Sequence, residues 1–477
     1  MHSFRSDLAL LRDRRFALLF AARTISVLGG SFAPVALAFG VLGLPGATPG
    51  TLSVVLTAEA LPTVVFMLAG GVIADRFPRH RVMMTGDVLN AVAFFSIAAM
   101  MLTGWTPVPV LAAAAALSGV AMAVLFPALA GIVPDVVPAD RLQTANALLG
   151  LGVNSSRVAG LVLSGATVVL IGGGWALAVS GVMFTVAALL VAALRLTPAG
   201  RAAGERHSVL ADLRGGWREF VSRQWLWVVV AQFSVLVMAA QAAHGVLGPL
   251  VAKESLGGAA AWSAVLTGEA AGMIFGVFLA LRLRPRRPIL VGTVLTVPTG
   301  LPYLLLGVGA PLWTVVAGAV VMGVCFDLFG VLWNTTMQRE IPPASLSRVS
   351  SYDALGSLMF GPLGLLLAGP IAITAGPRPA LVGCAGIILV VSLAALLSPG
   401  VRNLRAPDTA AADRAPGTAG DREPGTAAGD REPVGDAAGP EAADPKPAAD
   451  AVDTADAVDM VARGPVADAE PGSPARQ

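Results

Sequence analysis

The chain has 477 residues, of which 55% are hydrophobic and only 13% are charged, and its formal net charge is +2. A soluble protein carries about a quarter charged residues, so this composition excludes an ordinary soluble protein and indicates an integral protein of the lipid bilayer. The two cysteines, Cys325 and Cys384, lie inside apolar stretches. We therefore expect no disulfide, no metal site and no cofactor.

Twelve apolar runs of spanning length follow one another along the chain. Each is expected to be a helix, because only a helix satisfies its own backbone in lipid without closing into a barrel. The first six runs cover residues 16–43, 51–74, 82–103, 108–133, 142–171 and 175–194. The second six cover residues 225–250, 259–281, 289–308, 312–333, 349–374 and 380–397. The predicted fold class is an all-α membrane protein with twelve transmembrane helices.

A sequence repeat relates the two sets of six runs. The segment VLTAEA at residues 55–60 recurs as VLTGEA at residues 265–270, an offset of 210. A second echo, at an offset of 207, pairs residues 141–148 with residues 348–355 at the start of the fifth and eleventh runs. Because two echoes at nearly one offset fall on matching helices, we predict two pseudo-symmetric six-helix halves.

This repeat and the local composition predict four regions. Residues 1–194 form the first six-helix half, residues 195–224 a cytoplasmic central linker, and residues 225–399 the second half. Residues 400–477 are rich in Ala, Pro, Gly, Asp and Glu and have almost no large apolar residues. We expect this segment to be a disordered cytoplasmic tail of drifted low-complexity sequence. A role in binding a partner is the alternative.

The arginines predict the orientation in the membrane. With the N-terminus in the cytoplasm, 22 arginines fall on the inner side, and only Lys253 and Arg378 fall on the outer side. Basic residues concentrate on the cytoplasmic side of membrane proteins. We therefore predict a multi-pass protein of a bacterial plasma membrane with both termini in the cytoplasm. The first run is too long for a signal-peptide core, and we expect it to remain as an uncleaved span.

The turn between the second and third runs is the most specific motif. It has the spacing G-x-x-x-D-R-x-x-R-x-R, formed by Gly71, Asp75, Arg76, Arg79 and Arg81. This turn resembles the signature loop between helices 2 and 3 of the major facilitator superfamily of transporters. The superfamily is built from two parallel six-helix halves, as the repeat predicts.

The resemblance implies a cytoplasmic gate. In such transporters the carboxylate of this loop rests on the N-terminus of helix 11, whose exposed N–H groups attract it. Here Asp75, ending the second helix, would lie against the start of helix 11 near residues 347–351. Asp135 would pair with Arg76 or Arg81. The alternative is that the loop only fixes topology through its charge.

Within the superfamily, the chain is similar to the macrolide-efflux and enterobactin-exporter branch of drug:proton antiporters. The similarity is carried by residues 14–16 leading into 23–26, by Leu61-Pro62, and by residues 142–148. It covers residues 10–400 and implies export of a small molecule.

Two acidic residues inside the spans are the first candidates for transport chemistry. Ionisable groups in a membrane span are costly unless they are paired or wetted. Glu59 and Glu269 occupy matching positions of the second and eighth helices, which flank the central cavity in the superfamily. A carboxylate in such a wall can take up and release a proton as the cavity opens to either side. The alternative is that each Glu locks the interface between the halves.

Six further residues complete the predicted site for proton coupling or substrate binding: Arg23, Asn154, Arg157, Gln241, His244 and Asp327. Arg23 would neutralise Glu59 or bind an anionic group of the substrate. Arg157 lies beside Asn154, as if on a wet face. Structural pairing with an acidic neighbour is the alternative for both arginines.

The other two ionisable candidates also have two interpretations each. Asp327 would take part in transport, or it would cap a helix or form an ion pair. His244 lies near Gln241 and would titrate near neutral pH, or it would be a hydrogen-bonded residue of the cavity wall.

The residues together predict a secondary active transporter. An enzyme is not expected, because the sequence has no P-loop, nucleophile constellation or metal-ligand spacing. We predict proton-coupled efflux of an amphipathic small molecule (a drug, an antibiotic or a siderophore-like compound) by alternating access. Its partners would be that substrate, protons and lipid, with no nucleic acid, and the chain would be a monomer. The alternatives are an importer or facilitator of a small metabolite, and a non-transporting membrane sensor or scaffold.

Overall fold

The computed structural model describes residues 9–138, 141–194, 209–280 and 282–405. Residues 1–413 form one compact unit, and the second unit, residues 414–477, lies outside the described residues. In the described part, twelve helical segments are long and apolar enough to cross a membrane. The predicted number of spans is therefore confirmed.

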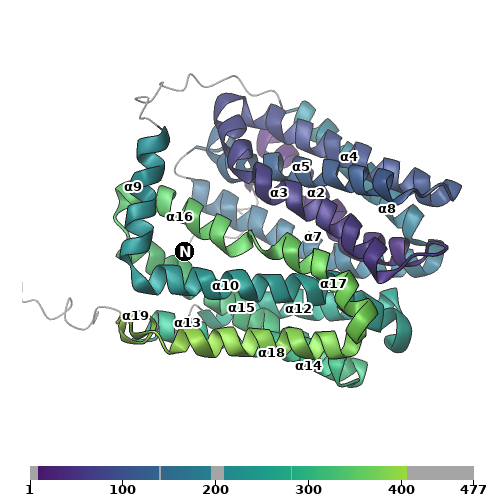
Figure 1. The fold of residues 1–477 in the computed structure, drawn as a ribbon. Coiled ribbons are helices and arrows are strands. Elements are labelled where there is room, and N and C mark those ends of the chain that lie inside the picture. The colour runs from purple at the N-terminus through teal and green to yellow at the C-terminus, as the bar shows by residue number, and fades with distance from the viewer. Residues whose placement is uncertain (1–8, 139–140, 195–208, 281, 406–477) are drawn as a thin grey trace, which may run out of the picture. The chain divides into compact units, whose positions relative to one another are not determined.

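The first half is built from six long helices (Figure 1). They are α2 (Arg14–Leu42), α3 (Pro49–Arg76), α4 (Arg79–Thr103), α5 (Val108–Gly131), α7 (Leu142–Ile171) and α8 (Gly173–Ala192), with two short elements, η1 (Ala9–Arg12) and α6 (Val133–Val136). Polar caps fix where two of them begin. Asp13 accepts hydrogen bonds from two backbone N–H groups of α2, and Thr48 and Thr51 form a capping box at α3.

The second half has the same number of spans, but several are interrupted. The seventh combines α10 (Gln224–Gln241), η3 (Ala242–Leu247), α11 (Gly248–Val251) and η4 (Ala252–Leu256). The eighth to tenth are α12 (Ala259–Ala280), then α13 (Pro288–Leu295) with η5 (Val297–Gly300) and α14 (Leu301–Gly307), then α15 (Leu312–Glu340). The last two are α16 (Pro343–Leu358) with α17 (Gly361–Ala375), and α18 (Pro377–Leu396), followed by α19 (Pro399–Asn403).

The interruptions have local causes. η5 contains Pro298, which has no N–H to donate to the helix ladder. The break between α16 and α17 precedes Gly361-Pro362, where proline occupies a position in the first turn of α17. η3 and η4 are π-helical turns, and such turns are frequent at functional sites.

The packing repeats between the halves. In the first half α3 packs along α5, and in the second half α12 packs along α15. A Cβ atom on Gly119 of α5 would lie 2.0 Å from the carbonyl oxygen of Glu59, and a Cβ on Gly323 of α15 would lie 2.1 Å from that of Glu269. Only glycine allows these approaches. The sequence repeat therefore corresponds to a repeated packing of helices, as expected for the predicted pseudo-symmetric halves.

The helix ends gather at two sides of the bundle. We call the side with the helix termini at Arg14, Arg76, Arg79 and Arg223 the arginine-rich end. The opposite side holds the Leu42–Pro49, Thr103–Val108 and Leu256–Ala259 connections, and we call it the arginine-poor end. Between the halves, α3 packs against α17 and α7 packs against α12.

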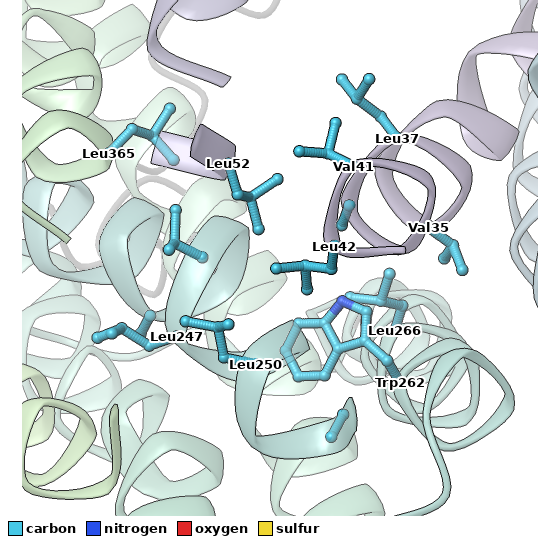
Figure 2. Packing of buried hydrophobic residues seen from close by; sticks show 14 of the residues in the cluster. Val35, Leu37, Val41, Leu42, Leu52, Leu247, Leu250, Trp262, Leu266 and Leu365 are labelled. Atoms are coloured by element: carbon cyan, nitrogen blue, oxygen red, sulfur yellow. The ribbon is translucent and has the colours of Figure 1, made fainter. Parts of the chain in front are cut away.

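The apolar core shows where the halves meet. One cluster of buried residues contains members of both halves, among them Leu42 and Leu52 of the first and Leu250 and Trp262 of the second, which lie near the arginine-poor end. Figure 2 shows these side chains gathered together. Two further clusters belong to one half each and include residues near the arginine-rich end, such as Phe16 in the first half and Trp225 in the second. The described core therefore joins the halves at the arginine-poor end.

One predicted boundary is wrong in detail. Helix α19 occupies the first residues of the segment predicted to be a disordered tail, because Val401 is completely buried in the cluster that contains Trp225. Residues 406–477 lie outside the described residues. The eleventh span begins at Arg348, as predicted near residues 347–351, although its helix α16 already begins at Pro343.

The linker contains a helix. Residues 195–208 lie outside the described part, but α9 (Val209–Ser222) follows them. The ring centroid of Trp217 lies 5.5 Å from that of Tyr352, and the centroid of Phe220 lies 6.1 Å from it. Helix α9 is therefore held against α16 by aromatic packing.

Candidate functional site

A cavity of about 420 Å³ lies between the two halves. Residues of α2, α3 and α5 line one side, and residues of α10, η3, α12, α16 and α17 line the other. Most of the lining is apolar, and the polar side chains that reach it are Glu59, Thr63, Gln241 and His244. An apolar cavity with a few polar groups is typical of a binding site for a small molecule.

Glu59 lines this cavity and has one hydrogen-bond donor. The hydroxyl of Ser118 on α5 lies 3.4 Å from its Oε1, and the same hydroxyl lies 2.9 Å from Oδ1 of Asn90 on α4. One hydroxyl proton serves both acceptors, so the bond to Glu59 is weak. Among the described residues no basic nitrogen lies within 4.0 Å of this carboxyl group.

Glu269 differs from its repeat partner. It does not line the cavity, and its Oε2 lies 3.6 Å from Nδ1 of His244. The imidazole of His244 meets the ring of Trp262 edge-on, with centroids 5.5 Å apart, and both rings line the cavity. The two acids occupy matching positions of the repeat but have different surroundings. The second half places a histidine beside its acid, whereas the first half places a serine there.

Arg23 does not reach Glu59. Its Nη1 lies 3.5 Å from the carbonyl oxygen of Leu129 on α5, and its Nε is buried without a hydrogen-bond partner. The prediction that Arg23 neutralises Glu59 is wrong. One turn further along α2, Ser26 donates a 2.8 Å hydrogen bond to Asp87 of α4, which is 1% exposed.

A second, smaller cavity brings together three predicted residues from both halves. It measures about 110 Å³ and is lined by Asn154 and Arg157 of α7 and by Asp327 of α15, with apolar residues of α12. The Oδ2 atom of Asp327 is buried without a hydrogen-bond partner. Among the described residues no Arg157–Asp327 ion pair forms within 4.0 Å, so these opposite charges share one cavity without direct contact.

The structure revises the gate residues in part. Asp135 Oδ1 lies 3.6 Å from Nη1 of Arg79, not beside Arg76 or Arg81 as predicted. The two side chains are 23% and 32% exposed, so this pair contributes little to stability. Gly71 and the side chain of Asp75 lie outside the part that the structure describes in detail, and the latch on helix 11 stays a prediction.

The arginine-poor end is closed by two matching contacts, which we call the serine clasps. Ser53 of α3 donates a 2.8 Å hydrogen bond to the carbonyl oxygen of Leu365 on α17. Ser263 of α12 donates a short hydrogen bond to the carbonyl oxygen of Leu161 on α7. Each serine lies two residues before its copy of the repeat, VLTAEA or VLTGEA.

Glycine and lysine complete this closure. A Cβ on Gly369 would lie 2.6 Å from Oγ of Ser53, and one on Gly165 would lie 2.6 Å from Oγ of Ser263. Small residues let helices approach closely in membranes. The ammonium of Lys253 also donates to the carbonyl oxygen of Leu42 across the halves. Hydrogen bonds, as well as the shared apolar cluster, therefore separate the cavity of about 420 Å³ from the arginine-poor end.

Several residues at these contacts were not predicted. Ser53, Ser118 and Ser263 are ordinary residues of apolar runs, and their partners are backbone carbonyls or side chains of distant helices. The sequence repeat could have indicated two of these serines, because serine recurs at positions 53 and 263, at the offset of 210.

A twelve-span bundle with a central cavity between two repeated halves is the architecture of a secondary transporter. The profile of the Major Facilitator Superfamily matches residues 16–359. The chain belongs to this superfamily, as its signature loop predicts, and it is a multi-pass membrane transporter rather than an enzyme.

Named relatives agree with this assignment. The chain is 27% identical over 427 residues to the multidrug efflux pump Tap of Mycobacterium tuberculosis, covering 84% of this chain and 97% of the relative. It is 28% identical over 435 residues to the enterobactin exporter EntS of Citrobacter koseri, covering 85% and 97%. The predicted similarity to the enterobactin-exporter branch is confirmed.

Solved structures share the fold. The nucleoside transporter NupG aligns with a TM-score of 0.64 at 13% identity, over 80% of this chain and 98% of that one. A bacterial homologue of the human lysosomal transporter Spinster aligns with a TM-score of 0.60 at 15% identity, over 84% and 98%.

Proposed function

We propose that this chain is a proton-coupled efflux transporter of a bacterial plasma membrane, which exports an amphipathic small molecule by alternating access. The observation that carries the proposal is the apolar cavity of about 420 Å³, in which Glu59 has a shared hydroxyl and no cation among the described residues as its partner. Glu59 is partly buried in this apolar wall, and a carboxylate in such surroundings without a counter-charge is costly to ionise. Glu59 is therefore suited to carry a proton in one state of the cavity and to release it in the other.

The relatives favour efflux over import. Two proteins that the chain resembles along almost their whole length are named as a multidrug efflux pump and an enterobactin exporter. Both names describe movement of small molecules out of the cell. We extend this direction of transport to the present chain. We also infer an amphipathic substrate, because such a molecule suits a mainly apolar cavity.

The arginine distribution supports an orientation with the arginine-rich end and both termini in the cytoplasm. The described structure is closed at the arginine-poor end by the serine clasps and the shared apolar cluster. In this orientation the closed end faces the outside of the cell. Export then requires both clasps to break while the arginine-rich ends of the halves approach each other.

The direction can be tested in inverted membrane vesicles that contain the full chain, with ethidium as a fluorescent amphipathic probe. Acidifying the vesicle lumen should drive ethidium into the lumen, because protons leaving the lumen are exchanged for the probe. Vesicles with Glu59→Gln protein should accumulate no more probe than vesicles without the transporter. Uptake by the wild-type protein that does not depend on the lumen pH would contradict proton-coupled efflux.

A further inference from the structure

A third cavity, of about 180 Å³, lies within the second half between α10, α15 and α16. Its lining combines one carboxylate with four aromatic side chains: Phe233, Phe326, Phe329 and Trp333. The ring centroids of Phe233 and Phe329 are 5.2 Å apart, and those of Phe329 and Trp333 are 6.0 Å apart, in near-parallel stacks. We call this cavity the aromatic pocket.

The carboxylate of the aromatic pocket is Asp353, and its partners are neutral. The indole Nε1 of Trp333 donates a 3.0 Å hydrogen bond to Oδ2, and the hydroxyl of Ser357 lies 3.4 Å from Oδ1. Among the described residues no basic nitrogen lies within 4.0 Å of this carboxyl group. The pocket thus holds a carboxyl group that two neutral hydrogen-bond donors orient and that has no basic partner within 4.0 Å among the described residues.

The first half provides an internal comparison. The glycine contacts align Gly119 with Gly323, which is an offset of 204 residues. At this offset the pocket residues Phe326, Phe329 and Trp333 correspond to Met122, Leu125 and Leu129 of the first half. The second repeat aligns Asn146 with Asp353. The first half therefore has neither an aromatic ring nor an acid at these four positions. Packing alone does not require this combination in the second half.

The aromatic pocket lies next to the main cavity. Val237, one turn after Phe233 on α10, lines the main cavity, and so does Leu358, which follows Ser357 on α16. The pocket residues lie on the arginine-rich side of these positions along both helices. A molecule moving from the arginine-rich end toward the main cavity would pass the pocket.

We propose that the aromatic pocket is a subsite for an organic ammonium group, with Asp353 as the counter-ion and the aromatic side chains as its walls. Carboxylates and the faces of aromatic rings both attract organic cations, and the attraction is larger where water is excluded. The inference rests on the proposed function, since it assigns the amine of an exported substrate to a place beside the cavity. It specifies a protonated or quaternary amine as the group bound.

The test uses benzyltrimethylammonium and its uncharged isostere neopentylbenzene, which have the same shape. Binding of each labelled probe to the purified full chain in lipid nanodiscs is measured by equilibrium dialysis. We expect the wild-type protein to bind the ammonium about tenfold more tightly than the isostere. Asp353→Asn, which installs the residue of the first half, should weaken ammonium binding about tenfold and leave isostere binding unchanged.

Two further variants separate the subsite from general effects of mutation. Glu340→Gln removes a carboxylate at the end of α15, where it pairs with Arg339 outside the pocket, and it should leave ammonium binding unchanged. Phe326→Met, again the residue of the first half, should weaken ammonium binding while the protein stays folded. Equal binding of the two probes by the wild-type protein, or unchanged ammonium binding by Asp353→Asn, would overturn the proposal.

The binding assay needs no gradient and no transport. Failure of proton-coupled efflux would therefore leave a positive binding result standing. Conversely, proton-driven export without a preference for the ammonium probe would refute the subsite alone.

Discussion

The imidazole Nδ1 of His244 lies 3.6 Å from the carboxylate Oε2 of Glu269, whereas the partner of Glu59, at the matching position of the first half, is a shared serine hydroxyl. The two halves therefore repeat their backbone packing but not their chemistry. In the proposed cycle Glu59 carries the proton in the cavity, and the His244–Glu269 pair holds the opposite wall in place.

The His244–Glu269 pair should couple the two residues energetically. In a double-mutant cycle with His244→Gln and Glu269→Gln, we expect a coupling energy of about 0.5 kcal/mol, because both side chains are partly exposed. Thermal unfolding of the four proteins in detergent measures this coupling energy. Strictly additive effects of the two substitutions would contradict a direct interaction between the side chains.

The serine clasps should control the opening of the arginine-poor end. Removing either hydroxyl by Ser53→Ala or Ser263→Ala should favour the outward-open state by about 1 kcal/mol, the net value of a typical hydrogen bond. Distances between spin labels on the Leu42–Pro49 and Leu256–Ala259 connections would report the shift. Ser96→Ala is the matched control, since Ser96 is exposed and bonds only within its own helix. Identical distance distributions in all four proteins would exclude a gating role for the clasps.

The repeated glycine contacts should be intolerant of a methyl group. Gly119→Ala and Gly323→Ala would each place a Cβ about 2 Å from a backbone oxygen of the neighbouring helix. We expect each to destabilise the protein by about 2 kcal/mol or more, because helix backbones rather than side-chain ends must move. Gly330→Ala, on the same helix as Gly323, meets nothing within 4 Å and should be nearly neutral. Unfolding temperatures in detergent provide the comparison.

Truncation separates a transporter from a scaffold that works through its tail. A chain ending after residue 405 keeps α19 and should transport like the full protein. A chain ending after residue 398 also loses Val401, which is completely buried, and should be destabilised by about 1.5–3 kcal/mol from that side chain alone. If the chain ending after residue 405 lost transport while its expression and unfolding temperature stayed unchanged, the tail would have an active role.

Much of the fold could be predicted from the sequence. The number of spans follows from hydropathy, and the twofold repeat follows from residues 55–60 and 265–270, because lipid restricts the chain to helices. The breaks in the ninth and eleventh spans were not predicted. Pro298 and Pro362 signal a disturbance there, but a membrane helix often tolerates proline.

The site was only partly predictable. Glu59, Gln241 and His244 do line one cavity, because polar side chains in a membrane span face the interior of the helix bundle rather than lipid. Which groups pair was not predictable. Arg23 contacts a backbone carbonyl on α5 rather than Glu59, and Asp135 pairs with Arg79, since pairing depends on helix rotations that sequence spacing does not determine.

The most direct test of the central claim, that Glu59 couples proton movement to transport, is ethidium-driven proton flux in proteoliposomes carrying a pH-sensitive dye. The wild-type protein should move protons opposite to the ethidium gradient, and Glu59→Gln should abolish the proton flux while ethidium binding persists. Glu269→Gln should keep the coupling, because its partner His244 and not the carboxylate itself faces the cavity. Proton flux by Glu59→Gln at the wild-type ratio to ethidium would contradict the account.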